Sequence, residues 1–103
     1  MLLREAMEKI AGIDFSGNPD TEILGISYDS RRVRNGDLFV AVKGEKADGA
    51  VFVPQAVNMG AAAVAAEKKP EMSVPVACLV VLDTRRFLAE ISRIFFQDPA
   101  SVL

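Results

Sequence analysis

The chain has 103 residues, half of them hydrophobic and a quarter charged, which is the composition of one globular domain. Its formal net charge of −2 gives no reason to expect a nucleic-acid partner. Because the sequence has no histidine and a single cysteine, the common zinc sites, a Ser-His-Asp triad and a disulfide framework are excluded.

Hydrophobic periodicity and turn residues predict helices that alternate with strands. The helical segments carry apolar residues at three- and four-residue steps, whereas the strand segments are short apolar runs. Pro54 falls in a first helical turn, Gly60 at a helix C-cap, and Asp83 where it would cap the last helix. In chain order, the predicted elements are a helix over 2–11, strands over 23–27 and 38–42, a helix over 53–59, strands over 62–65 and 77–81, and a helix over Thr84–Gln97.

This order of elements predicts an α/β fold, a small sandwich with a mainly parallel sheet flanked by helices. Sheets of this kind bind ligands at the carboxyl ends of their strands. Two polar loops follow predicted strands in this way, one around Ser30 and one around Glu45. We therefore expect a ligand site where these two loops lie.

The sequence predicts neither membrane insertion nor export. The longest charge-free stretch, residues 49–66, contains Pro54 and Asn58 and is better explained by a helix followed by a buried strand. The N-terminal residues carry charges where a signal peptide would be apolar. Cys78 lies in an apolar run, where a free cysteine packs as a small hydrophobe. We therefore expect a cytoplasmic protein.

The turn Asp29-Ser30-Arg31 is the first candidate binding feature. Its serine hydroxyl can donate to a phosphate or sugar oxygen, or accept from the N–H of a base. Arg31, Arg32 and Arg34 crowd the same turn, and guanidinium groups suit phosphates. The alternative is that Asp29 and Ser30 satisfy backbone groups of the turn while the arginines form a solvated face.

The polar loop between Gly44 and Gly49 is the second candidate. Its backbone amides could bind the edge of a flat heterocycle or an anion, or the segment could be a plain connection. The sequence contains neither of the common glycine-rich phosphate-binding motifs, and its carboxylates form no obvious acid–base pair. We therefore expect no ATP site, no catalytic residue and no metal site in this chain.

A longer pattern resembles the N-terminal domain of the Mur ligases, the enzymes that build the peptide of bacterial peptidoglycan. The resemblance begins with ISYDSRRVRNGDLFVAVKG, residues 26–44, and Ala47-Asp48-Gly49. Within the family the chain is most similar to the ligases that add the third amino acid, and Tyr28 before Asp29 favours these over the ligase that adds D-Ala-D-Ala. The pattern continues through residues 52–56, 60–61, 83–85 and 95–101.

This resemblance implies that residues 1–103 are a single UDP-binding N-terminal domain, from which the central ATP-binding domain and the C-terminal domain are absent. The full-length enzyme would use ATP and Mg²⁺ to add diaminopimelate or lysine to UDP-N-acetylmuramoyl-L-alanyl-D-glutamate, whereas this domain alone would be inactive. Its partners would be that substrate, through the UDP end, and its own two further domains. The alternatives are the first domain of the D-Ala-D-Ala-adding ligase and a stand-alone nucleotide-sugar or interaction module.

The resemblance also implies which residues contact the UDP moiety. They are Tyr28, Ser30, Glu45, Lys46 and Ala47. Ser30 stands in the matching Asp-Ser-Arg, and Tyr28 is expected to contribute its backbone. Glu45 and Lys46 stand where family members often have His and Gln, so contacts from this loop are expected from its backbone.

Overall fold

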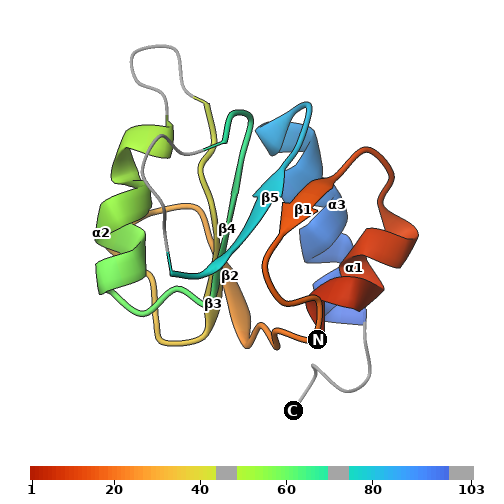
Figure 1. Cartoon of the computed structure of the whole chain (residues 1–103), viewed down its shortest axis with the longest axis horizontal. Helices are drawn as coiled ribbons and strands as arrows, with labels where there is room; N and C mark the ends of the chain where they lie inside the picture. The colour runs from red at the N-terminus through yellow and green to blue at the C-terminus, as the bar shows by residue number, and fades with distance from the viewer. Residues whose placement is uncertain (44–48, 70–74, 98–103) are drawn as a thin grey trace.

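The computed structural model describes residues 1–43, 49–69 and 75–97, which form one sheet with helices on both faces (Figure 1). The strand order is β1-β5-β4-β3-β2. The strands are β1 (Asp14–Ser16), β2 (Gly25–Ser27), β3 (Asp37–Val40), β4 (Ala63–Ala66) and β5 (Ala77–Val80). The helices are α1 (Leu3–Lys9), the short 3-10 helix η1 (Gly49–Phe52), α2 (Val53–Asn58) and α3 (Thr84–Gln97).

The strands β2, β3, β4 and β5 are parallel, and β1 runs antiparallel to β5 at one edge. In the register of the ladder, Leu38 lies opposite Ile26 on one side and Ala63 on the other. Every residue of β3 and β4 is buried. Continuous apolar runs of this kind are typical of central strands that are covered on both faces.

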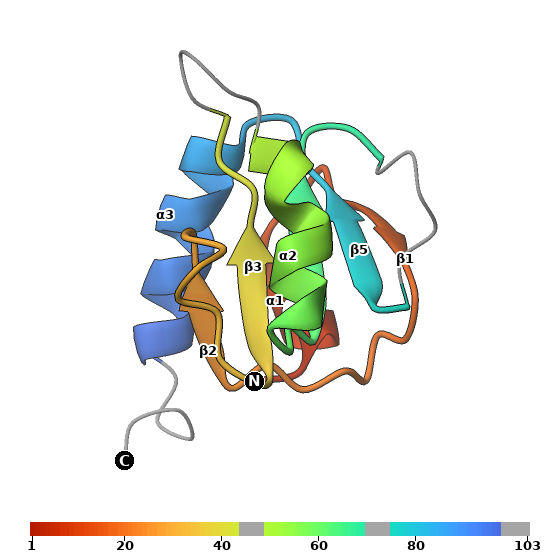
Figure 2. The ribbon, with the colours of Figure 1, turned by 90° about the vertical axis from the view of Figure 1, so that its left-hand side faces the viewer.

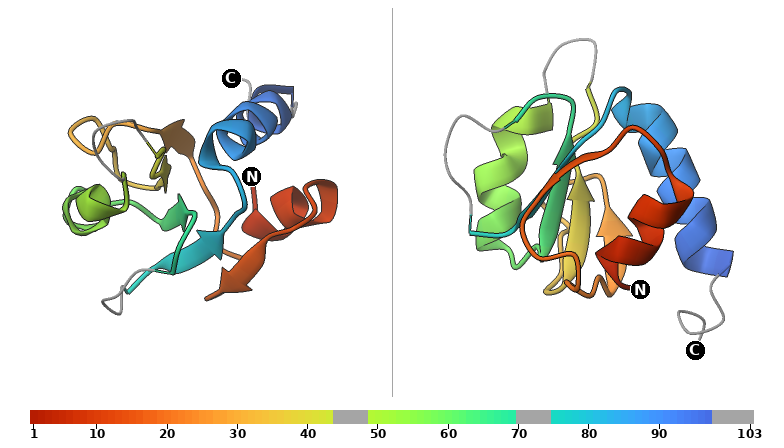
Figure 3. Two further views of the ribbon diagram at one scale, coloured as in Figure 1. Left: turned by 90° about the horizontal axis from the view of Figure 1, so that it is seen from above. Right: turned by 45° about the vertical axis from the view of Figure 1, so that its right-hand side comes forward.

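Two apolar cores cover the two faces of the sheet. Figures 2 and 3 show α2 on one face and α1 with α3 on the other. Because side chains alternate along a strand, Leu38 and Val40 pack with α1 and α3, whereas Phe39 packs with α2. Cys78 lies in the α2 core, where burial raises the pKa of its thiol. The prediction that Cys78 is a core residue is therefore confirmed.

The predicted α/β fold with a mainly parallel sheet flanked by helices is confirmed, and the predicted strands and helices are all present. Their bounds differ by a few residues. The first helix ends at Lys9 because Ile10 is extended, with φ −120° and ψ 117°. The first predicted strand begins at Gly25 instead of 23, and Asp83 caps α3 by accepting from the backbone N–H groups of Arg85 and Arg86.

One strand, β1, was not predicted from the sequence. It has only three residues, of which Asp14 and Ser16 are exposed, so the segment carries no continuous apolar run. Its position depends on pairing with β5, with Phe15 opposite Leu79. The backbone leaves this edge through Gly17, whose φ is +122° and where an added Cβ would lie 2.8 Å from the Cα of Ala77.

Candidate functional site

The four parallel strands end at one edge of the sheet, here called the carboxyl edge. In Figure 1 the chain leaves β3, β4 and β5 toward the top of the view. The turn after β2 begins at Tyr28, the loop after β3 leaves through Lys43, and β5 leads through Asp83 into α3. This is the edge at which parallel sheets bind ligands.

Ser30 is held in the turn after β2 by contacts on both sides. The Ser27 hydroxyl donates to the carbonyl of Asp29 (3.0 Å), and the Arg32 N–H donates to the same carbonyl (2.9 Å). Ser30 itself is buried, and its Oγ donates to Oε1 of Gln55 on α2 at 2.8 Å. This hydrogen bond fixes the turn against a helix that lies 25 residues further along the chain.

Asp29 and Arg31 bind each other within the same turn. One oxygen of the Asp29 carboxylate accepts from the Arg31 backbone N–H (3.0 Å) and from its Nε (3.1 Å), and the other accepts from Nη2 (3.1 Å). The hydrogen bonds from Arg31 lower the pKa of Asp29, and the carboxylate raises the pKa of the Arg31 guanidinium. Asp29 therefore supports the turn, as the alternative interpretation of this motif predicted.

A second polar junction joins the carboxyl ends of β3, β4 and β5 through Thr84. The Thr84 hydroxyl donates to Oε2 of Glu67 (2.9 Å) and accepts from the backbone N–H of Lys43 (3.1 Å). The backbone N–H of Thr84 donates to the same Glu67 oxygen at 3.1 Å. Thr84 is fully buried, so this junction fixes the position of Lys43 at the exit from β3.

The structure places two of the five predicted contact residues. Ser30 is 6% exposed, whereas the Tyr28 side chain is largely solvent-exposed, with 69% of the residue accessible. The predicted contacts at Glu45, Lys46 and Ala47 lie outside the described residues. Sequence reasoning missed Gln55 and the Glu67–Thr84 pair as site residues. Gln55 and Thr84 lie within segments that resemble the family and Glu67 lies outside them, but the sequence does not show which distant residues they contact.

Tyr28 lies beside a shallow hollow on the outer side of β2. The hollow is also lined by the exposed side chains of Leu24 and Phe96, and by the exposed Arg32 and Arg34. Asp29 and Asp37 line the same hollow, so charged groups of both signs face it together with the apolar surface.

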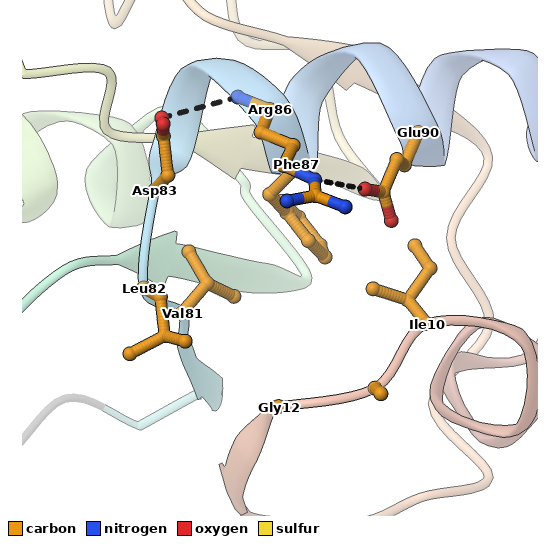
Figure 4. Close-up of a pocket in the computed structure, with 9 residues that line it drawn as sticks. Ile10, Gly12, Val81, Leu82, Asp83, Arg86, Phe87 and Glu90 are labelled. Carbon is orange, nitrogen blue, oxygen red and sulfur yellow. Dashed lines mark hydrogen bonds and ion pairs between the residues drawn. The ribbon is translucent and has the colours of Figure 1, made fainter.

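A separate hollow lies between the end of α1 and the start of α3 (Figure 4). It is lined by apolar side chains, including Ile10, Val81 and Phe87, and by Arg86. Nε of Arg86 donates to Oε1 of Glu90 at 2.9 Å, so the guanidinium is paired within its own helix. This hollow contains none of the predicted site residues.

Within residues 1–43, 49–69 and 75–97, no three His, Cys, Asp or Glu side chains gather as metal ligands. None of the helices in the same described ranges combines the length and the apolar character needed to cross a membrane.

The strand order and the pairing place the chain in the class of mainly parallel α/β domains. The family model described as "Mur ligase family, catalytic domain" matches residues 22–96. The chain therefore belongs to the Mur ligase family, which confirms the resemblance found in its sequence.

Several relatives support this assignment. The chain is 36% identical over its whole length to a UDP-N-acetylmuramoyl-L-alanyl-D-glutamate–2,6-diaminopimelate ligase of Bacteroides fragilis, of which the match covers 21%. A solved UDP-N-acetylmuramoylalanyl-D-glutamyl-2,6-diaminopimelate–D-alanyl-D-alanyl ligase of Acinetobacter baumannii superposes with a TM-score of 0.68 at 37% identity, covering 85% of this chain and 19% of that one. A MurF ligase of Thermotoga maritima, solved in complex with ADP, gives a TM-score of 0.60 at 34% identity over 75% of this chain and 17% of that one. The chain thus spans about one fifth of the length of the curated relative.

Proposed function

We propose that this chain is the UDP-binding N-terminal domain of a ligase that adds the third amino acid, diaminopimelate or lysine, to UDP-N-acetylmuramoyl-L-alanyl-D-glutamate. The observation that carries the proposal is the match of the whole chain to a diaminopimelate-adding ligase at 36% identity. Curated relatives from other bacteria carry the same ligase name. The full-length enzyme would act in the cytoplasm in peptidoglycan synthesis.

The UDP end of the substrate would bind at the carboxyl edge. Ser30 would contribute its hydroxyl, Tyr28 its backbone, and Glu45, Lys46 and Ala47 the backbone of the loop after β3. The turn at Ser30 supports this role because internal hydrogen bonds hold it in place before any ligand arrives. Preorganisation of this kind lowers the entropy lost on binding.

ATP and Mg²⁺ are cofactors that the family implies for the complete enzyme. The residues of this chain do not fit them, because the sequence has no glycine-rich phosphate loop and the described residues hold no cluster of metal ligands. We assign their binding, and the ligation itself, to parts of the protein outside this chain. Its own contribution is to hold the substrate by the UDP end.

The second candidate is the first domain of a D-Ala-D-Ala-adding ligase, which the 37% identity to the A. baumannii structure favours. The experiment that separates the candidates uses the full-length protein encoded by the same gene. We expect it to form product from UDP-N-acetylmuramoyl-L-alanyl-D-glutamate, ATP and either diaminopimelate or lysine. Ligation of D-Ala-D-Ala to the tripeptide substrate instead would assign the second candidate. A coding sequence that stops at Leu103 would contradict both and favour a stand-alone module.

A further inference from the structure

The hollow on the outer side of β2, here called the β2 hollow, gathers apolar surface that the domain itself leaves uncovered. Seven large apolar or aromatic side chains are exposed in the described part of the chain. Three of them, Leu24, Tyr28 and Phe96, line this hollow, with 66%, 69% and 66% of each residue accessible. A single exposed apolar side chain is ordinary, whereas a group of them on one surface marks a place where another protein part packs.

The fold holds these side chains in place. The Leu24 N–H donates to the carbonyl of Gly36 at 2.9 Å, and an added Cβ at Gly36 would lie 2.7 Å from Cδ1 of Leu24, so Leu24 lies directly over that glycine. Phe96 stands edge-on to Phe95, with ring centroids 5.2 Å apart and ring planes at 87°. Because Phe95 is buried in the core of α1 and α3, the Phe96 ring packs against a fixed partner. The surface is therefore formed before any partner arrives.

The charges at this hollow indicate what kind of surface would cover it. Both of its carboxylates are bound within the domain, Asp29 by the side chain of Arg31 and the buried Asp37 by the backbone N–H of Arg34 at 2.9 Å. Arg32 and Arg34, in contrast, are exposed. A partner that covers the β2 hollow therefore needs an apolar centre, together with carboxylates that pair with these two arginines.

The β2 hollow also lies where the chain leaves the domain. Helix α3 ends at Gln97, one residue after Phe96, and Figure 2 shows the C-terminal half of α3 beside β2. The polypeptide that follows Gln97 therefore starts next to a residue of the hollow. The match to the diaminopimelate-adding ligase covers 21% of that relative, so in the proposed function most of the enzyme lies outside this chain.

We propose that the β2 hollow is the docking surface for the domain that follows this one in the full-length enzyme. This inference rests on the proposed function, because it takes the chain to be followed by further domains of one enzyme. In that function Tyr28 contributes only its backbone to UDP, so its side chain stays available for the docked domain. Docking at the β2 hollow sets the following domain next to the turn after β2 and fixes its orientation relative to the carboxyl edge.

Hydroxyl-radical footprinting of the ligand-free full-length protein and of the 103-residue chain tests this surface, because the modification rate of a side chain follows its exposure to solvent. We expect the rates of Tyr28 and Phe96 to be lower in the full-length protein by about threefold or more, since the centre of an interface excludes water. Tyr28 is the only tyrosine of the chain, so its modification is assigned directly. Circular dichroism checks that the 103-residue chain is folded.

Leu82 is the matched control, because it is 90% exposed but lines the separate hollow between α1 and α3. Its rate should be the same in both proteins. Within the full-length protein alone, the rates relative to those of the free amino acids should rank Leu82 above Tyr28 and Phe96. This second comparison does not depend on the folding of the shorter chain.

A substitution separates docking from a change inside the domain. Phe96→Ser removes an aromatic side chain from the proposed interface, so in the full-length protein it should raise the modification rate of Tyr28 by about twofold or more. In the 103-residue chain the same substitution should leave that rate unchanged, because Tyr28 is already exposed there. Leu82→Ser should leave the Tyr28 rate unchanged in both proteins.

The outcomes separate this inference from the proposed function. If Tyr28 and Phe96 are modified equally fast in both proteins while the full-length protein ligates diaminopimelate or lysine, the inference is wrong and the proposed function stands. Equal protection of Leu82 would also contradict it, since protection would not be specific to the β2 hollow. If the 103-residue chain forms a dimer in which Tyr28 is protected, a second copy covers the hollow and the inference is wrong. A full-length protein that protects the hollow but ligates neither amino acid contradicts the proposed function and supports the docking surface.

Discussion

In the turn after β2, the Asp29 carboxylate is held by Arg31. The carboxylate accepts two hydrogen bonds from the Arg31 side chain and one from the Arg31 backbone. These bonds stabilise the charged form and lower the pKa of Asp29. The contribution of the pair to stability is therefore complete above about pH 4, the ordinary value for an aspartate, and is lost as the pH falls through the lowered value.

We predict that Arg31→Gln raises the pKa of Asp29 partway toward its ordinary value, because the side-chain hydrogen bonds are lost while the backbone bond remains. The measurement is a pH titration of the Asp29 carboxyl carbon by NMR. Arg32→Gln is the control, since the Arg32 side chain acts on the Asp29 carboxyl only through its charge, which is the weakest of the influences on its pKa. An unchanged pKa in Arg31→Gln, or a larger change in Arg32→Gln, would contradict this description of the turn.

At the level of the secondary-structure elements, Thr84 joins the carboxyl ends of β3, β4 and β5. It does so through its hydroxyl and its backbone N–H. Thr84→Val keeps the shape of the side chain but leaves the Lys43 N–H and a Glu67 oxygen without this partner. We predict a loss of about 0.5–1.5 kcal/mol in the free energy of unfolding, the net contribution of a hydrogen bond, because the Lys43 and Glu67 ends of the junction are partly accessible to water. Thr84→Ser keeps the hydroxyl and should lose less than Thr84→Val.

Urea denaturation measures this effect, and Thr21→Val provides the control. The Thr21 hydroxyl also forms a hydrogen bond, to the Asn18 carbonyl at 2.7 Å, but in an exposed turn where water can replace the lost partner. Its substitution should change the free energy of unfolding by about 0.5 kcal/mol or less. If Thr84→Val costs no more than Thr21→Val, the junction does not hold the carboxyl edge together.

The elements that could be predicted from the sequence are those with a local signal. The sequence runs that form β3, β4 and β5 are continuous and apolar, and α3 has a clear apolar face. The alternation of such strands and helices along the chain predicted the mainly parallel sheet. β1 has no such signal, since two of its three residues are exposed and only the pairing with β5 defines it. Gln55 and Thr84 were missed as site residues for a related reason. Their partners lie 25 residues away for Gln55, and 17 and 41 residues away for Thr84.

At the scale of the whole molecule, the sheet brings these separate contacts to one side of the domain. The α2 core positions Gln55 against the turn of Ser30, and the junction at Thr84 fixes Lys43, the last described residue before Glu45, Lys46 and Ala47 in the sequence. The chain spans about one fifth of the length of its curated relative, and in the proposed function the muramoyl-peptide end of the substrate, about half of the recognition surface, would lie outside this chain. Binding of UDP by this chain alone should therefore be weak, with a Kd on the order of 0.1–10 mM, without ATP or metal.

The central claim, that UDP binds at the carboxyl edge around Ser30, is tested most directly by an amide-shift titration with UDP of the wild type and Ser30→Ala. We predict saturable shifts clustered at residues 28–31 and 44–48, and an affinity lower in Ser30→Ala by about 0.5–1.5 kcal/mol, the value of one neutral hydrogen bond. Shifts centred instead on the hollow between α1 and α3, or no shifts even at high millimolar UDP, above the upper end of the expected Kd range, would contradict the claim.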